Sequence, residues 1–274
     1  MESTDHKLDS TELFTGLANG FQEFRPSYPE VLLAELKLYV EKHRNSTWPR
    51  RPVVYDIGAG TGILTRQLRS VLGGQFGIRG VEPNQDMREA ARKNTPTELD
   101  IDYIYGVAER LPIEDGKASV IVVAQAIHWF NRARFYREVR RGLHVNGVFA
   151  IMQNDRAWNV SALDDAYEQF LEATSAGYDR HCRDFPYLDE LTAEEGFSEV
   201  TSHSVEWSRE ITEDQFLGLS LTVTWVKRAI WSLGREKVVN SLKNLVVPFL
   251  TTCGRVHVHY HSKLFLAVSK QTAS

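Results

Sequence analysis

Between residues 53 and 154, short apolar runs alternate with segments whose apolar residues recur at helical spacing. The apolar, β-branched runs lie between turn residues and predict buried strands at 53–56, 76–81, 101–105, 118–124 and 148–153. Helical spacing predicts helices over 63–72 and 85–94, and a third that ends near Gly142. The regular alternation of strand and helix predicts a parallel α/β sheet with crossover helices.

The pattern is less regular on both sides of this stretch. Residues 11–45 are predicted to be helical, with a break at Arg25-Pro26-Ser27-Tyr28-Pro29. Beyond Asn154 the sequence predicts an acidic amphipathic helix over 163–174. Two further strands are predicted, and between them two helices, over the ranges 198–208, 213–233, 235–250 and 256–268.

Composition narrows the class of protein. The chain has 274 residues, of which 42% are hydrophobic and 25% charged, as expected of a globular protein with a sizeable core. A net charge of −4 supplies no broad attraction for a polyanion, which argues against nucleic acid as a partner. The polar N-terminus and the lack of a long apolar run predict a soluble, cytoplasmic protein with no membrane partner. Cys182 and Cys253 are too few for a disulfide framework and are interpreted as structural thiols.

The sharpest chemical signal is the turn Asp56-Ile57-Gly58-Ala59-Gly60-Thr61-Gly62 after the first strand. Glycines allow a ligand to lie against the main chain, and the free N–H groups of the following helix face it. A dinucleotide site has the pattern Gly-x-Gly-x-x-Gly, whose third glycine is replaced here by Ile63. The motif Asp-x-Gly-x-Gly-x-Gly instead resembles the first motif of the class I S-adenosylmethionine-dependent methyltransferases.

Later strand ends extend this resemblance. Glu82 follows the second strand, 20 residues beyond Gly62, where an acid can accept hydrogen bonds from both ribose hydroxyls. In the methyltransferases that this chain resembles, the loop at 106–112 holds the adenine. Many of them have an acid where this chain has Val107, so Glu109 or a backbone carbonyl is the expected acceptor. The segment 125–130, Gln-Ala-Ile-His-Trp-Phe, should line the site, and Arg-Gly-Leu-x-x-x-Gly at 141–147 resembles the family's late motif.

The element Arg25-Pro26-Ser27-Tyr28-Pro29 resembles one found ahead of the first motif in small-molecule methyltransferases of the trans-aconitate methyltransferase type. The segment is either a docking helix or a lid over the cofactor. In the second case Arg25 can form a bidentate pair with a carboxylate. That carboxylate belongs either to the methionyl tail of the cofactor or to an acidic substrate.

The resemblance implies a Rossmann-like fold with a seven-stranded, mostly parallel sheet, an antiparallel last hairpin and a helical substrate cap. We therefore expect residues 1–274 to form a single domain. Its parts are lid helices at 11–45, a cofactor-binding core at 53–154, cap insertions at 155–196 and 211–254, and a terminal hairpin of 198–208 and 256–268.

The expected cofactor is S-adenosyl-L-methionine and the expected partner a small-molecule substrate, bound by a monomer or homodimer. The residues predicted to contact the cofactor are Arg25, Tyr28, Asp56, Gly58, Ala59, Gly60, Thr61, Glu82, Pro83, Ala108, Glu109, Gln125, Ala126 and Trp129. Candidate catalytic residues are His128, Asn154 and Tyr178. For His128, a wall or hydrogen-bonding role is favoured over that of a general base.

Three functions remain open at this point. The favoured one is methyl transfer to an oxygen, nitrogen or carbon of a small molecule, either a carboxylate or an apolar or aromatic metabolite. The second is intramolecular cyclisation of the cofactor to azetidine-2-carboxylate with release of methylthioadenosine, in which Asn154 and Tyr178 orient the amine. The third is cofactor binding without turnover. No metal is expected, because His257, His259 and His261 alternate on one strand about 7 Å apart, an awkward span for three ligands.

Overall fold

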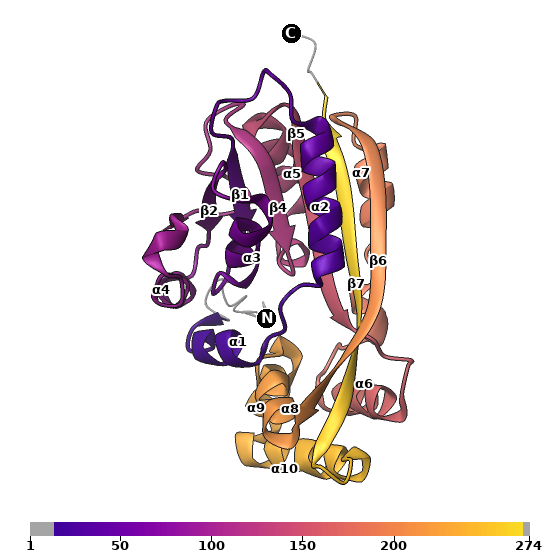
Figure 1. The fold of residues 1–274 in the computed structure, drawn as a ribbon. Helices are drawn as coiled ribbons and strands as arrows, with labels where there is room; N and C mark the ends of the chain where they lie inside the picture. Colours follow the sequence, from indigo (N-terminus) through magenta and orange to yellow (C-terminus); the bar gives the residue numbers. More distant parts are fainter. Residues whose placement is uncertain (1–13, 271–274) are drawn as a thin grey trace, which may run out of the picture.

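A computed structural model describes residues 14–270 and contains a seven-stranded sheet within them. The strand order is β3-β2-β1-β4-β5-β7-β6 (Figure 1). The strands are β1 (Val53–Ile57), β2 (Gly77–Val81), β3 (Ile101–Ile104), β4 (Ala118–Ala124), β5 (Leu143–Arg156), β6 (Phe197–Thr212) and β7 (Arg255–Ser269).

The first five strands of the chain run parallel, and β7 is antiparallel to both of its neighbours, β5 and β6. This arrangement confirms the predicted fold class, a mostly parallel sheet with an antiparallel last hairpin. Every residue of β4 is buried, as its unbroken apolar run predicts for a central parallel strand. The strand order reverses between β1 and β4, so a ligand cleft is expected at the carboxyl ends of these two strands.

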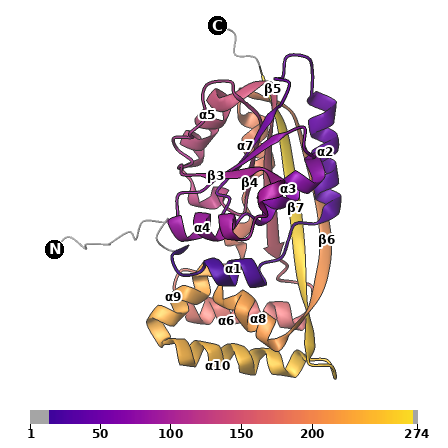
Figure 2. The same cartoon turned by 60° about the vertical axis from the view of Figure 1, so that its left-hand side comes forward.

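Helices cover both faces of the sheet (Figures 1 and 2). Residues of α2 and α3 pack on one face, and residues of α5 and α7 pack on the other. The α-helices within the described residues are α1 (Ala18–Phe24), α2 (Glu30–His43), α3 (Ile63–Leu72), α4 (Gln85–Lys93), α5 (Arg132–Gly142), α6 (Ala162–Thr174), α7 (Tyr187–Ala193), α8 (Glu213–Leu221), α9 (Thr224–Leu233) and α10 (Arg235–Val246).

A separate layer of helices lies beyond the carboxyl edge of the parallel strands. The long strands β6 and β7 extend past the sheet and carry α8, α9 and α10, which lie beside α6 at the lower end of Figure 1. These helices share an apolar cluster with the ends of β6 and β7, built around side chains such as Tyr167, Phe216 and Tyr260. We call α6, α8, α9, α10, the short helix η4 (Arg180–Arg183) and the loops at 175–179 and 222–223 the cap.

Several boundaries differ from those predicted. Residues 155–196 do not all belong to the cap, because Tyr187 and Leu191 of α7 pack into the core on the sheet. The helix predicted over 213–233 is interrupted at Thr222 and Val223, where β-branched residues disfavour helix and Thr222 bonds back to Leu219. The predicted lid begins at residue 11, and its first three residues lie outside the described part of the chain.

Candidate functional site

A cavity of about 210 Å³ lies at the carboxyl ends of β1, β2 and β4. Every residue that the sequence predicts to contact the cofactor lines it. Further lining residues include Phe14 and Phe21 from the lid segment and Met87 from α4. The structure therefore brings together side chains from six separate stretches of the chain, although cofactor binding by each of them stays a prediction.

The glycine turn is held in place by main-chain contacts. The N–H groups of Gly58 and Ala59 donate to the carbonyl of Val81, at 2.8 Å and 3.1 Å. Gly58 has a φ of 71°, and a Cβ there would lie 2.6 Å from the Cβ of Ala126. At Gly60 a Cβ would meet nothing within 4 Å. The turn thus leaves no room for a side chain at Gly58, which packs against Ala126, and has open space beside the main chain at Gly60.

Glu82 connects this turn to the end of β2. Its carboxylate accepts the N–H of Gly60 and the N–H of Asn84, each at 2.9 Å. Burial raises the pKa of Glu82, while these two hydrogen bonds act in the opposite direction. A carboxylate has about four acceptor positions, so lone pairs remain for two hydroxyl donors.

Asp56 supplies a second acid to the cavity. Its side chain is 1% exposed and accepts a hydrogen bond of 2.6 Å from the hydroxyl of Thr65. Burial raises the pKa of Asp56 to about 7, the Thr65 hydrogen bond opposes this, and the charge of Glu82 adds to it. Two acids in one enclosed site favour a ligand that carries positive charge.

The loop expected to hold the adenine also lines the cavity, through Ala108 and Glu109. Glu109 accepts the N–H of Asn131 at 2.8 Å, which connects the loop to the start of α5. The second oxygen of Glu109 is not used in this bond. Gln125 has a φ of 51° and its side-chain amide donates to Asp155 at 3.3 Å.

The lid and the cap meet at Arg25. Its guanidinium donates to the hydroxyl and the carbonyl of Thr222, at 2.8 Å and 3.0 Å, and lies 4.7 Å from the ring centroid of Phe21. Tyr28 is fixed by Gln67 of α3, whose side-chain amide bonds both its main-chain N–H and its carbonyl at 2.9 Å. Sequence reasoning missed Thr222 and Gln67, because no motif marks either residue and Thr222 is separated from Arg25 by 197 positions.

Of the three candidate catalytic residues, only Asn154 lines the cavity. Its side-chain amide donates to the carbonyl of Ser27 at 3.3 Å and accepts from the hydroxyl of Ser262 at 2.7 Å. His128 lies against Phe185 and Trp129, with ring centroids 6.4 Å and 5.2 Å apart. Burial lowers the pKa of His128 to about 4, and the positive charge of Arg25 adds to this effect.

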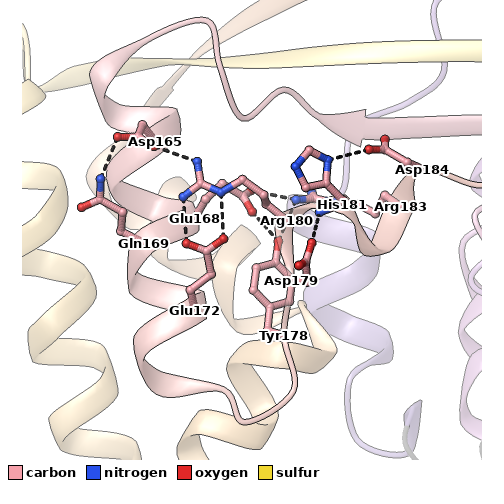
Figure 3. Close-up of polar contacts among 10 residues, drawn as sticks. All are labelled: Asp165, Glu168, Gln169, Glu172, Tyr178, Asp179, Arg180, His181, Arg183 and Asp184. Carbon is pink, nitrogen blue, oxygen red and sulfur yellow. Dashed lines mark hydrogen bonds and ion pairs between the residues drawn. The ribbon is translucent and has the colours of Figure 1, made fainter.

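Tyr178 lies in the cap (Figure 3). Its hydroxyl bonds the carboxylate of Glu168 and accepts from Arg183 at 2.7 Å. It is not among the lining residues of the cavity, so in this structure it is a packing and hydrogen-bonding residue of the cap. A catalytic role for Tyr178 or His128 stays a prediction.

The three alternating histidines do not converge on one point. His259 bonds Asp164 at 2.8 Å, and His257 lies 3.9 Å from Glu210. Among residues 14–270 there is no group of three or more histidine, cysteine, aspartate or glutamate side chains placed to hold a metal ion. No helix in the same part of the chain has the length and apolar character needed to cross a membrane.

Residues 55–151 match the family described as "Methyltransferase domain". An uncharacterised methyltransferase of Mycobacterium tuberculosis is 25% identical over 264 residues, which cover 92% of this chain and 98% of that protein. Among solved structures, a provisionally assigned type II methyltransferase of Anaeromyxobacter dehalogenans has a TM-score of 0.65 at 21% identity, covering 90% of this chain and 98% of the other. A second solved structure is Haemonchus contortus phosphoethanolamine N-methyltransferase 2 in complex with phosphomonomethylethanolamine and S-adenosylhomocysteine. It has a TM-score of 0.52 at 15% identity, and the match covers 95% of this chain and 57% of the other.

These findings confirm the resemblance to class I S-adenosylmethionine-dependent methyltransferases that the glycine motif and Glu82 predict. The domain match and the curated relatives also confirm the enzyme class, an S-adenosylmethionine-dependent transferase, and with it the cofactor. The finer likeness to the trans-aconitate methyltransferase type stays a prediction.

Proposed function

We propose that this chain, an S-adenosylmethionine-dependent transferase with a class I methyltransferase domain, transfers the sulfonium methyl group to a small molecule. The observation that carries the proposal is the cavity, which joins the glycine turn and Glu82 to the lid, where Arg25 contacts the cap. A concave site under such a cover suits a small acceptor better than a polymer.

The residues present fit the cofactor. Glu82 has free acceptor positions for the ribose hydroxyls, and Ala108 lies in the apolar part of the cavity expected to hold the adenine. Asp56 offers a negative charge toward the cationic end of the ligand. Arg25 lines the cavity and retains donors beyond its two bonds to Thr222, which supports a contact with a carboxylate, either that of the methionyl tail or that of an acidic substrate.

When bound, the cofactor would supply its methyl group, and the electron pair of the broken bond between sulfur and methyl carbon would stay on sulfur to give S-adenosylhomocysteine. The acceptor atom supplies the pair for the new bond and, unless it is already ionised, loses a proton. Because the sulfonium is already activated, the protein has mainly to align the acceptor and exclude water. Asn154 lies at the cavity wall on β5 and is the polar side chain that we expect to orient the acceptor.

Incubation with S-adenosylmethionine tests this proposal against its two rivals. Methyl transfer predicts S-adenosylhomocysteine that forms only when an acceptor is added. Methylthioadenosine formed from the cofactor alone would indicate cyclisation instead, and tight cofactor binding without any product would indicate a binding protein. The arrangement of Tyr178, bonded to Glu168 and Arg183 away from the cavity, gives no support to cyclisation. A cytoplasmic location, the absence of nucleic-acid binding, and a monomeric or homodimeric state stay predictions.

A further inference from the structure

A group of buried polar side chains lies under the cap, next to the cofactor cavity. Arg156 is the last residue of β5 and pairs in register with Tyr260 of β7. Its guanidinium carbon lies 3.8 Å from the ring centroid of Tyr167 on α6 and 5.3 Å from that of Phe216 on α8. We call Arg156, Tyr167 and Tyr260 the Arg156 cluster.

The hydrogen-bond donors of this cluster have no partners. Within the described part of the chain, neither Nη1 nor Nη2 of Arg156 makes a hydrogen bond, and the hydroxyls of Tyr167 and Tyr260 make none. These three residues are only 8%, 1% and 2% exposed. Buried polar groups are nearly always paired, so four unpaired donors in one place indicate a site for an acceptor from outside the chain.

Asp164 is a carboxylate beside Arg156, and only its Oδ2 is hydrogen-bonded, while its Oδ1 has no hydrogen-bond partner among the described residues. Its Oδ2 accepts from Ser161, as part of the capping box of α6, and bonds Nδ1 of His259 at 2.8 Å. Its Oδ1 is 4.0 Å from Nη2 of Arg156, which is an ion pair without a hydrogen bond. Asp164 therefore offsets part of the charge of Arg156 and leaves the two terminal nitrogens of Arg156 without a hydrogen bond.

Three guanidinium groups act on the hydroxyl of Tyr260. Burial raises the pKa of Tyr260, and the guanidinium groups of Arg156, Arg209 and Arg25 act in the opposite direction, which places all three near its hydroxyl. An arginine fork flanked by hydroxyl donors matches the geometry of a carboxylate, which accepts two parallel hydrogen bonds. The ligand that this chemistry selects is an anion with planar oxygens.

The cluster also lies at a useful distance from the cavity. Asn154 lines the cavity, and Arg156 follows it on the same face of β5, a step of about 7 Å. Arg25 lines the cavity as well and is close enough to Tyr260 and Tyr167 for their charges to affect its pKa, which burial lowers. The cluster is thus one strand step from a residue of the cavity wall, within the length of a small molecule that has two functional groups.

We infer that the Arg156 cluster binds a carboxylate group of the methyl acceptor and that a second group of the same molecule receives the methyl group. The inference rests on the proposed methyl transfer. A carboxylate held by a guanidinium is neutralised and is a poor nucleophile. The methyl group is therefore transferred to the second functional group of the molecule, which is another carboxylate, a hydroxyl or an amine. The substrate class is thus a small bifunctional acid.

Binding of simple acids to the protein saturated with S-adenosylhomocysteine tests this directly. Succinate and glutarate are titrated by calorimetry against succinamide and glutaramide, which have similar shapes and no charge. We expect the dicarboxylates to bind and the diamides to bind much more weakly. In Arg156→Met, which keeps the length of the side chain, dicarboxylate affinity should fall by about 10- to 100-fold, as for the loss of charge-assisted hydrogen bonds. Arg156→Lys should show an intermediate loss, because it keeps the charge and loses the fork.

Arg180→Met is the matched control. Arg180 lies in the same cap and pairs with Asp165 and Glu172, outside the cluster (Figure 3). This variant should keep dicarboxylate affinity within about twofold, since a solvated pair contributes little to a distant site. Affinity for S-adenosylhomocysteine and the melting temperature, measured for all variants, identify any general loss of folding.

Two results would overturn the inference. One is equal binding of dicarboxylates and diamides to the unmodified protein, a comparison that does not depend on any variant. The other is dicarboxylate binding that Arg156→Met and Arg156→Lys leave unchanged, which would make Arg156 and Asp164 a structural pair only. Failure of the proposed function looks different: dicarboxylates would bind through Arg156, yet no added acid would yield S-adenosylhomocysteine from S-adenosylmethionine.

Discussion

The cofactor-binding core and the cap each bury a carboxylate, and they do so in different ways. Glu82 in the core is 7% exposed and its partners are two main-chain N–H groups, those of Gly60 and Asn84. Glu168 in the cap is 1% exposed and its partners are side chains, those of Tyr178 and Arg183. Main-chain donors are set by the turn, whereas side-chain donors depend on which residues are present. The carboxylate of the core is therefore positioned by backbone geometry, and that of the cap is held by specific side chains.

Replacing each acid by glutamine should separate the two regions most clearly. Glu168→Gln removes the charge that balances the partly buried Arg183, and we expect it to lower the free energy of unfolding by about 3 kcal/mol. Affinity for S-adenosylmethionine should change little. Glu82→Gln should instead weaken cofactor binding by about 10- to 100-fold, as expected for lost hydrogen bonds to a charged group. Chemical denaturation and calorimetry measure the two quantities.

The contrast between the regions fails if both variants lose stability and cofactor affinity to the same extent. That result would mean that the cap and the core unfold and bind as one cooperative unit. Lys42, whose ion pair with Glu199 is exposed on α2 far from both carboxylates, supplies a control. Lys42→Gln should leave both quantities within experimental error, because exposed pairs contribute about 0–1 kcal/mol.

Two glycines with the same backbone conformation should respond differently to alanine. Gly58 in the core has a φ of 71°, and its added Cβ would lie 2.6 Å from Ala126. Gly177 in the cap has a φ of 78°, and its Cβ would meet nothing within 4 Å. Both variants lose about 1–2 kcal/mol to the left-handed conformation. Only Gly58→Ala should also weaken cofactor binding by tenfold or more, because Ala126 and the cavity wall must move. Equal cofactor affinities in the two variants would contradict this.

The difference between main-chain and side-chain contacts also explains which part of the cavity the sequence predicts well. Gly58, Gly60 and Glu82 lie within one strand–turn–helix unit and the strand after it, so their arrangement follows from local pattern and the register of parallel strands. Strand ends along the chain then converge at one edge of the sheet, which is why Ala108, Gln125 and the rest reach the same cavity.

The cap does not follow from such rules. Arg25 reaches Thr222 across 197 positions, and Arg156 at the end of β5 contacts Tyr167 of α6, whose placement against the strand no periodicity specifies. The break at Thr222 and Val223, and the return of α7 to the sheet, are also set by tertiary contacts rather than by local propensity. The sequence therefore predicts residues that line the cavity around the glycine turn and misses those where the lid meets the cap, such as Thr222, while cofactor binding by the predicted residues stays a prediction.

Cofactor affinity should depend on pH through Asp56 of the core. Its pKa of about 7 in the free protein lies above the ordinary value of 3.8, so it is protonated below pH 7 in the folded state. A cationic ligand favours the carboxylate, so binding below pH 7 releases a proton and affinity falls as pH falls, by up to about tenfold per pH unit. Calorimetry between about pH 6 and pH 8 in buffers of different ionisation enthalpy measures the affinity and the released proton.

Asp56→Asn is the control for this effect, because asparagine does not titrate and its affinity should be flat over the same range. The free protein adds a second check with the opposite dependence on pH. Since the folded-state pKa of Asp56 is raised, folding takes up a proton between about pH 4 and pH 7, and stability is lost as pH rises through this window. A wild-type affinity without pH dependence would show that Asp56 does not face the charged end of the cofactor.

His128, which stacks on Phe185, should show the smallest effect near neutral pH. Its pKa of about 4 keeps the imidazole neutral from about pH 6 to pH 8, so it contributes no inflection to the turnover profile in this range. Because the folded pKa lies below the unfolded value of 6.5, the unfolded chain binds the extra proton, and stability falls as pH decreases from about 6.5 to 4. His128→Gln should therefore lose less stability than the unmodified protein on acidification, measured by denaturant unfolding, and keep the shape of the turnover profile. An inflection near pH 6.5 that disappears in this variant would instead identify His128 as a titrating base, and would shift part of the acceptor chemistry from the cap to the end of β4.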